Sequence, residues 1–331
     1  MVSIFPWRRP ELAIDFGTAN LRVIRRDDGI VFDEPSLCCF ENFDRVPRLL
    51  AAGTAAQAMV GRTSGGLAVR RALSRGVLQD IDTATHLLRY AVNRAFGRKR
   101  MVGSGAVIGV PADATSAERG ALSTAARDAG LGAVRLVSEP FAAAVGAGLP
   151  VFQASGTMIV ECGAGTTEVA VLSLGGICLT RSVRVGGVAL NQAIADHLRF
   201  RHKFLIGEHV ADQIKQEYGK RRNTGLEAVA EIKGRSLVSM APALFRIPLV
   251  EFDGVMEKHA GQIVDVVRTV LNMTPPELSE DIHAHGVVLT GGGAATPCLK
   301  DMIEAETGLP VIIAEYSERC VARGLQHVLL N

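Results

Sequence analysis

The chain has 331 residues, of which 48% are hydrophobic and 21% are charged, and its formal net charge is +2. This length exceeds the usual size of a single core, and the apolar content excludes a disordered chain, so the sequence predicts two lobes. A nearly neutral charge without a long basic block argues against a nucleic-acid partner.

The cysteines and the hydropathy pattern indicate where in the cell the protein is expected. Six cysteines are scattered without a C-x-x-C pair, and no cleavable signal peptide is apparent, which predicts reduced thiols in a cytoplasmic protein. The one uncharged stretch that approaches the length of a bilayer span, residues 140–160, is broken by Gly148 and Pro150. We therefore expect a protein that is soluble or peripheral at a membrane.

In chain order, two stretches share one design, which is an apolar strand, a small-residue turn with an acidic group and hydroxyls, and a second apolar strand. The first covers residues 12–24 and carries Asp15, and the second covers residues 158–174 and carries Glu161. This repetition predicts an internal duplication at the scale of a domain.

Between and after these stretches, strand patterns alternate with helical patterns. Expected strands are residues 106–111, 134–137, 180–185, 228–236, 286–290 and 311–314. Expected helices are residues 116–129 with Ser116 as N-cap, 141–147 after Pro140, 189–202, 208–218, 250–271 and 298–307. The alternation predicts an α/β core.

The turns after the strands suit phosphate binding. A glycine-rich turn lets backbone N–H groups approach phosphate oxygens, and Thr18, Thr166 and Thr167 add hydroxyl donors. The acidic residues Asp15 and Glu161 are placed to hold a hydrated Mg²⁺. One such turn is usually only a tight connection, but two of them together with a third glycine turn at residues 291–293 favour a polyphosphate site.

Motifs along essentially the whole chain carry a resemblance. They are D-F-G-T-A-N at 15–20, E-P-S at 34–36, E-P-F-A-A-A at 139–144, G-A-G-L-P at 146–150, G-T-T-E-V-A at 165–170, S-L-G-G at 173–176, S-V-R-V-G-G at 182–187, L-I-G-E at 205–208, I-K at 214–215, T-P-P-E-L at 274–278 and L-T-G-G-G-A at 289–294. In this order they resemble the actin, Hsp70 and sugar-kinase superfamily, and within it the MreB family of rod-shape-determining bacterial actins.

The resemblance implies an α/β, actin-like two-lobed fold with a duplicated core, four subdomains and an interlobe nucleotide cleft. The implied boundaries are 1–31 and 76–145 for subdomain IA, 32–75 for IB, 146–182 and 247–331 for IIA, and 183–246 for IIB.

It also implies ATP and Mg²⁺ as cofactors and a set of site residues. The implied nucleotide-binding residues are Asp15, Gly17, Thr18, Ala19, Asn20, Gly163, Ala164, Gly165, Thr166, Gly187, Ala211, Asp212, Gln213, Ile214, Lys215, Gly291, Gly292, Gly293 and Ala294. Asp15 and Glu161 are the implied metal ligands, and Glu139 and Glu161 the implied catalytic residues. Glu139 matches the glutamate that orients the attacking water, although a glutamate at a helix N-terminus is also favoured by the helix dipole.

Four residues depart from the family pattern. Glu161 stands where the family has aspartate, Ala164 replaces the middle glycine, and Val188 and Asn191 replace two aspartates. Because ~1 Å of misplacement can cost ~10²-fold in rate, these changes are expected to affect turnover more than nucleotide binding.

The implied function is a weak ATPase coupled to polymerisation, with filaments of the chain itself at the inner-membrane surface that organise cell-wall elongation proteins. Apolar and basic residues at 4–9, and a second candidate at 98–102, could contact the membrane. Two alternatives stay open, namely a hydrolysis-impaired actin-like scaffold paralogue and, less favoured because no acceptor-binding insertion is found, a small-molecule kinase of the same superfamily.

Overall fold

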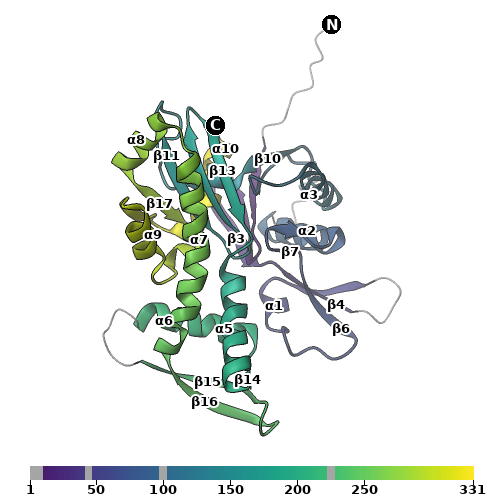
Figure 1. The fold of residues 1–331 in the computed structure, drawn as a ribbon. Helices are drawn as coiled ribbons and strands as arrows, with labels where there is room; N and C mark the ends of the chain where they lie inside the picture. Colours follow the sequence, from purple (N-terminus) through teal and green to yellow (C-terminus); the bar gives the residue numbers. More distant parts are fainter. Residues whose placement is uncertain (1–9, 42–46, 97–102, 222–227) are drawn as a thin grey trace. The chain divides into compact units, whose positions relative to one another are not determined.

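One arrangement of strands is built twice along the chain. The computed structural model describes residues 10–41, 47–96, 103–221 and 228–331, and it divides into two units (Figure 1). Unit 1 takes its described residues from Met1–Gln153, Leu174–Ile177 and Arg319–Asn331, and unit 2 comprises Ala154–Ser173 and Cys178–Glu318.

The main sheet of unit 1 has five strands in the order β10-β9-β1-β2-β3. Their bounds are β1 Leu12–Phe16, β2 Asn20–Arg25, β3 Gly29–Pro35, β9 Ala106–Val110 and β10 Val134–Ser138. Strand β1 pairs antiparallel with β2 and parallel with β9, which in turn pairs parallel with β10. A hairpin therefore lies at one side of β1 and parallel strands at the other.

The sheet of unit 2 repeats this plan in the order β13-β12-β11-β17-β18. Its strands are β11 Thr157–Cys162, β12 Thr167–Ser173, β13 Gly176–Val183, β17 Val287–Thr290 and β18 Val311–Ile313. Strand β11 pairs antiparallel with β12 and parallel with β17, as β1 does with β2 and β9. The predicted duplication is thus confirmed in its strand order and in its pairing.

Helices of unit 1 cover both faces of its sheet. They are α1 Thr54–Gln57, α2 Ile81–Phe96, α3 Ser116–Asp128, α4 Glu139–Gly146 and α10 Cys320–Leu330. Alternate residues of β1 share a core with α2 and α3. On the opposite face, Gly109 of β9 approaches Leu325 of α10. The N-cap of α3 is Thr115 and not the expected Ser116, because the Thr115 side chain and Glu118 form a capping box.

Glycines allow α4 and α10 to pack with their backbones in contact. A Cβ added at Gly146 would overlap the carbonyl of Cys320, and one added at Gly324 would overlap the carbonyl of Ala142. The structure groups α10 with unit 1, whereas the expected boundaries place residues 319–331 in subdomain IIA. The boundaries of the four subdomains stay a prediction.

Smaller strands complete unit 1. The three-stranded sheet is β5-β4-β6, and β7 and β8 form a separate pair. Their bounds are β4 Leu37–Glu41, β5 Arg48–Ala52, β6 Leu67–Arg71, β7 Leu73–Ser74 and β8 Val77–Leu78.

In unit 2 a long helix joins two separate cores. The elements around the sheet are α8 Pro276–His285, η3 Gly292–Ala295 and α9 Leu299–Thr307. The smaller group is α5 Gly187–His202, β14 Phe204–Leu205, α6 Glu208–Arg221, β15 Val229–Ser236, β16 Pro242–Pro248 and η2 Leu249–Phe252. Helix α7, Asp253–Met273, contributes Met256 to the core of the smaller group and Ala260 onward to that of the sheet (Figure 1).

Among the described residues, no helix combines the length and the apolar character that a bilayer crossing requires. The two candidate membrane segments, residues 4–9 and 98–102, lie outside the described residues.

Candidate functional site

The first turn, between β1 and β2, is closed by its own backbone and clamped by a serine. Gly17 N donates to Asn20 O at 2.9 Å. The buried Ser36 donates from its backbone N to Ala19 O at 2.8 Å and from its hydroxyl to Gly17 O at 2.7 Å. The short E-P-S motif at 34–36 therefore has a structural task, which is to fix the first turn.

Asp15, at the end of β1, is buried and paired with arginine. Arg22 N–H groups donate to Asp15 at 2.9 Å and to Asp33 at 3.1 Å, and Asn20 also donates to Asp33. Burial raises the pKa of the Asp15 carboxyl, and the charge of Arg22 only partly offsets this effect. Arg22 is a site residue that the sequence reasoning missed, because only the strand register places it opposite Asp15.

The second turn, between β11 and β12, has the same backbone closure. Gly163 N donates to Thr166 O at 2.8 Å. Two backbone hydrogen bonds join the start of α5 to this turn. Gly187 N donates to Gly163 O at 3.1 Å, and Val188 N donates to Ala164 O at 2.9 Å. A Cβ at Gly186 would lie 2.6 Å from the Ala164 carbonyl oxygen, so a glycine is needed there.

Glu161 occupies in unit 2 the place that Asp15 occupies in unit 1, but its cross-strand neighbour differs. In the register of β11 and β12 it faces Glu168, and both glutamates are buried. Carboxylate oxygens of the two lie within 4.8 Å of one another. Two buried carboxylates this close favour a cation or a shared proton between them, so these residues fit a divalent metal.

The third glycine turn lies against the end of β11. Gly291 has φ +81°, and a Cβ there would overlap the Cys162 carbonyl and lie 2.9 Å from Glu161 Oε1. A Cβ at Gly293 would lie 2.9 Å from that of Cys162. The structure thus brings Gly291 and Gly293 next to the end of β11, with Gly291 beside Glu161, while Ala294 is buried in the core of the sheet.

Helices α5 and α6 are joined by a polar network beside the second turn. Lys215 Nζ donates to Asn191 Oδ1 at 2.9 Å and pairs with Asp212 at 2.7 Å. Burial alone would raise the pKa of Asp212, but the Lys215 hydrogen bond and charge hold it below its ordinary value. A Cβ at Gly187 would lie 3.5 Å from Lys215 Nζ, so this ammonium lies close to the start of α5.

The other expected residues of α6 point in different directions. Ala211 and Ile214 are buried in the hydrophobic cluster of the smaller group, whereas Gln213 is exposed. A contact of Ala211 or Ile214 with a ligand would therefore have to use the backbone. Of the five expected α6 residues, Asp212 and Lys215 belong to the polar network with Asn191.

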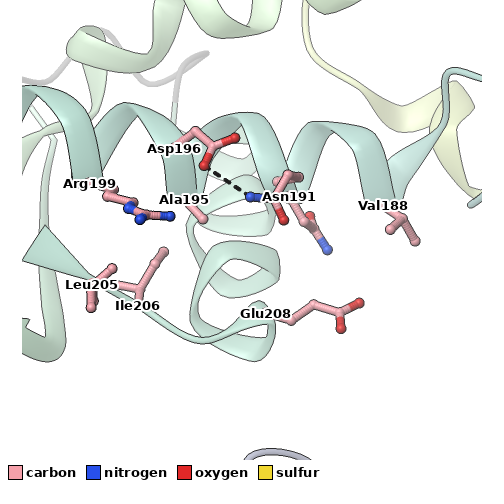
Figure 2. Close-up of a pocket in the computed structure, with 9 residues that line it drawn as sticks. Val188, Asn191, Ala195, Asp196, Arg199, Leu205, Ile206 and Glu208 are labelled. Carbon is pink, nitrogen blue, oxygen red and sulfur yellow. Dashed lines mark hydrogen bonds between the residues drawn. The ribbon is translucent and has the colours of Figure 1, made fainter. Parts of the chain in front are cut away.

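A pocket of about 250 Å³ lies between α5, β14 and the start of α6 (Figure 2). It is lined by Val188, Asn191, Gln192, Ala195, Asp196, Arg199, Leu205, Ile206 and Glu208. Gln192 donates to Asp196 at 3.0 Å along its α5 side. Val188 and Asn191, two of the residues that depart from the family pattern, thus both line this pocket, although Asn191 is largely buried.

Glu139 is the first residue of α4, directly after β10, and is half-buried. Its Oε1 lies 3.7 Å from the point where a Cβ of Gly109 would stand. The position suits a glutamate that is favoured by the helix dipole, because it lies at a helix N-terminus. It also suits a water-orienting glutamate, because the side chain lies beside Gly109 near the end of β9.

Comparisons with known proteins agree with one another. The sequence model of the family described as MreB/Mbl protein matches residues 9–331. The chain is 40% identical over 318 residues to the cell shape-determining protein MreB of Escherichia coli (strain K12), covering 95% of this chain and 91% of that protein. The crystal structure of MreB5 of Spiroplasma citri bound to ADP superposes with a TM-score of 0.90 at 33% identity, covering 97% and 96% of the two chains, and the AMPPNP-bound form of MreB5 superposes with 0.89 at 32% identity.

Proposed function

This chain belongs to the MreB/Mbl family and has an actin-like fold, and from these premises we propose that it binds ATP with Mg²⁺ and polymerises into filaments. We infer further that the filaments lie on the inner-membrane surface and organise the cell-wall elongation machinery. The protein would then be cytoplasmic and peripheral at that membrane.

One observation carries the nucleotide proposal, namely that the two turns have the same backbone geometry. In each, a glycine N–H donates to the carbonyl three residues on, at 2.9 Å for Gly17 and at 2.8 Å for Gly163. Each follows a strand that carries a buried carboxylate one residue before its end. Two matched loops of this kind suit the two sides of a polyphosphate, and MreB5 binds ADP and AMPPNP with the same fold.

We assign one phosphate-binding turn to each unit. We assign phosphate binding to residues 17–20 in unit 1 and to residues 163–166 in unit 2. Residues 211–215 and 291–294 would surround ribose and adenine. The Glu161 carboxylate, backed by Glu168, would hold hydrated Mg²⁺, while Asp15 already shares its charge with Arg22.

Hydrolysis is proposed to be slow, with Glu139 orienting the attacking water and Glu161 placing the metal. The observation that favours a hydrolysis-impaired scaffold as the second candidate is local. The longer Glu161 side chain shares its space with Gly291, where even a methyl group would come within 2.9 Å of Glu161 Oε1. A carboxylate in so confined a place adjusts poorly to the geometry that phosphoryl transfer requires.

Self-association would be head to tail, because a heterologous interface that does not close generates a filament. Sedimentation of purified protein with ATP, with ADP and without nucleotide, followed by negative-stain imaging of the pellets, tests this. We expect filaments that depend on nucleotide and are promoted by liposomes. A chain that stays monomeric at every concentration, with nucleotide and lipid present, contradicts the proposal, and transfer of phosphate to a small-molecule acceptor would favour the kinase alternative.

A further inference from the structure

Away from the nucleotide residues, two histidines and a glutamate converge in the smaller group of unit 2. His197 and His202 both come from the last turns of α5, and Glu251 comes from η2, the short helix that leads into α7. His202 Nε2 lies 2.7 Å from Glu251 Oε2, and His197 Nε2 lies 3.6 Å from the same oxygen. All three potential ligand atoms lie within 4.8 Å of one another.

A second observation concerns His197 itself. Its Nε2 is buried and makes no hydrogen bond, since 3.6 Å is beyond hydrogen-bonding distance. A buried polar atom without a partner is costly, and one that points at a second imidazole and a carboxylate can be satisfied by a shared ion.

We propose that His197, His202 and Glu251 form a binding site for a divalent transition-metal ion, with zinc as the best fit. Two imidazoles and one carboxylate are a common set of three protein ligands for zinc, with water in the fourth position. Ligand atoms of a tetrahedral zinc ion stand about 3.4 Å apart, so the three atoms need only small side-chain rotations to close around it. Oxygen-preferring Mg²⁺ is disfavoured by the two nitrogen donors.

The surroundings of the three side chains hold them in place. The ring of His197 packs 5.5 Å from that of Phe252, and the ring of His202 packs 5.0 Å from that of Phe245. These aromatic rings form an apolar wall, while Glu251 keeps 29% of its side-chain surface exposed and leaves a route for the ion and its water. A bound ion would tie the C-terminal end of α5 to η2 and hence to the start of α7.

Without metal, His202 and Glu251 contact each other directly, with His202 Nε2 and Glu251 Oε2 2.7 Å apart. A bound ion would replace this contact, because each imidazole would then direct a nitrogen lone pair at the ion.

The test uses the full chain, freed of metal by a chelator and carrying Cys178→Ser, because Cys178 is an exposed thiol that could bind the same ions. Calorimetric titration with zinc chloride gives the stoichiometry, and the visible absorption of added cobalt chloride reports four-coordinate nitrogen and oxygen ligation. With millimolar Mg²⁺ present to occupy the Glu161 and Glu168 carboxylates, we expect one zinc ion per chain and a rise in Tm of about 5 °C at a roughly 100-fold excess over Kd.

Single substitutions test whether His197, His202 and Glu251 are the residues that bind zinc. His197→Gln, His202→Gln and Glu251→Gln should each weaken zinc binding at least tenfold, whereas His209→Gln, at an exposed histidine on α6, should bind like the parent. Circular dichroism before the titration establishes that each variant is folded at the assay temperature. Equal zinc affinity in all four variants, or no binding by the parent chain, overturns the proposal.

Discussion

Replacing Glu161 by aspartate tests the link between the departures at the second turn and slow hydrolysis. The substitution removes one methylene, shortens the side chain that lies beside Gly291 by roughly 1.5 Å, and gives it the length that Asp15 has at the equivalent strand position. Since ~1 Å of misplacement can cost ~10²-fold in rate, Glu161→Asp should raise the rate of phosphate release by about 10- to 100-fold. That gain corresponds to roughly 1.4–2.7 kcal/mol of transition-state stabilisation.

Affinity for ATP should change only a few-fold, because most of the binding energy is expected from backbone groups of the turns rather than from this side chain. The lost methylene costs about 1 kcal/mol of stability, so the variant should remain folded. Single-turnover phosphate release and calorimetric ATP titration measure the two effects separately.

Two controls accompany this variant. Glu168→Asp removes the same methylene from the cross-strand neighbour of Glu161 and should not raise turnover. Glu139→Ala should abolish turnover in both the parent and the Glu161→Asp background while leaving ATP affinity within a few-fold. If the parent already releases phosphate as fast as Glu161→Asp, the site tolerates the longer carboxylate and the reasoning is refuted.

Three further predictions concern the first turn, a helix contact and the membrane. Ser36→Ala removes the 2.7 Å hydrogen bond from the buried Ser36 hydroxyl to the Gly17 carbonyl, so it should lower the free energy of unfolding by about 1–3 kcal/mol and weaken ATP binding. Thermal melts with and without nucleotide measure both effects. Gly324→Ala should cost about 1–3 kcal/mol or more because its Cβ overlaps a carbonyl of α4, whereas Gly254→Ala on α7, which meets no atom within 4 Å, should be neutral or stabilising in the same denaturation assay. Deletion of residues 1–9 should reduce co-pelleting with anionic liposomes, and unchanged co-pelleting would show that this segment is not the anchor.

The duplicated core could be predicted from the sequence because its signals are local. An apolar run, a small-residue turn and a second apolar run are visible without knowing what packs against them, and both copies fold as expected. The capping of α3 was predictable too, since Glu118 stands three residues after Thr115 and completes a capping box that Ser116 cannot form.

Several elements were missed. Helices α2 and α10 are amphipathic, so their local pattern could have identified them, whereas others lack a strong local signal. Helix α8 is short and polar on most of its surface, with a single fully buried residue, Ile282. Strand β16 alternates exposed and less exposed residues, but the exposed Leu244 hides this alternation in the sequence, and the strand depends on pairing with β15. For such elements the deciding contacts are distant in sequence, and a pattern within one segment does not contain them.

The asymmetry between the two turns shows where long-range contacts change the chemistry. Asp15 and Glu161 have equivalent places, but the register sets Arg22 opposite the first and Glu168 opposite the second. Arg22 lies within hydrogen-bonding distance of the first carboxylate, while the second lies beside another buried acid, an arrangement that favours an added cation. It follows that a metal ion would be held mainly from the second turn. Glu161, which replaces the family's aspartate, is then the residue with the greatest influence on the position of the metal ion. We therefore expect the substitution to slow hydrolysis, which depends on that position, while nucleotide binding persists.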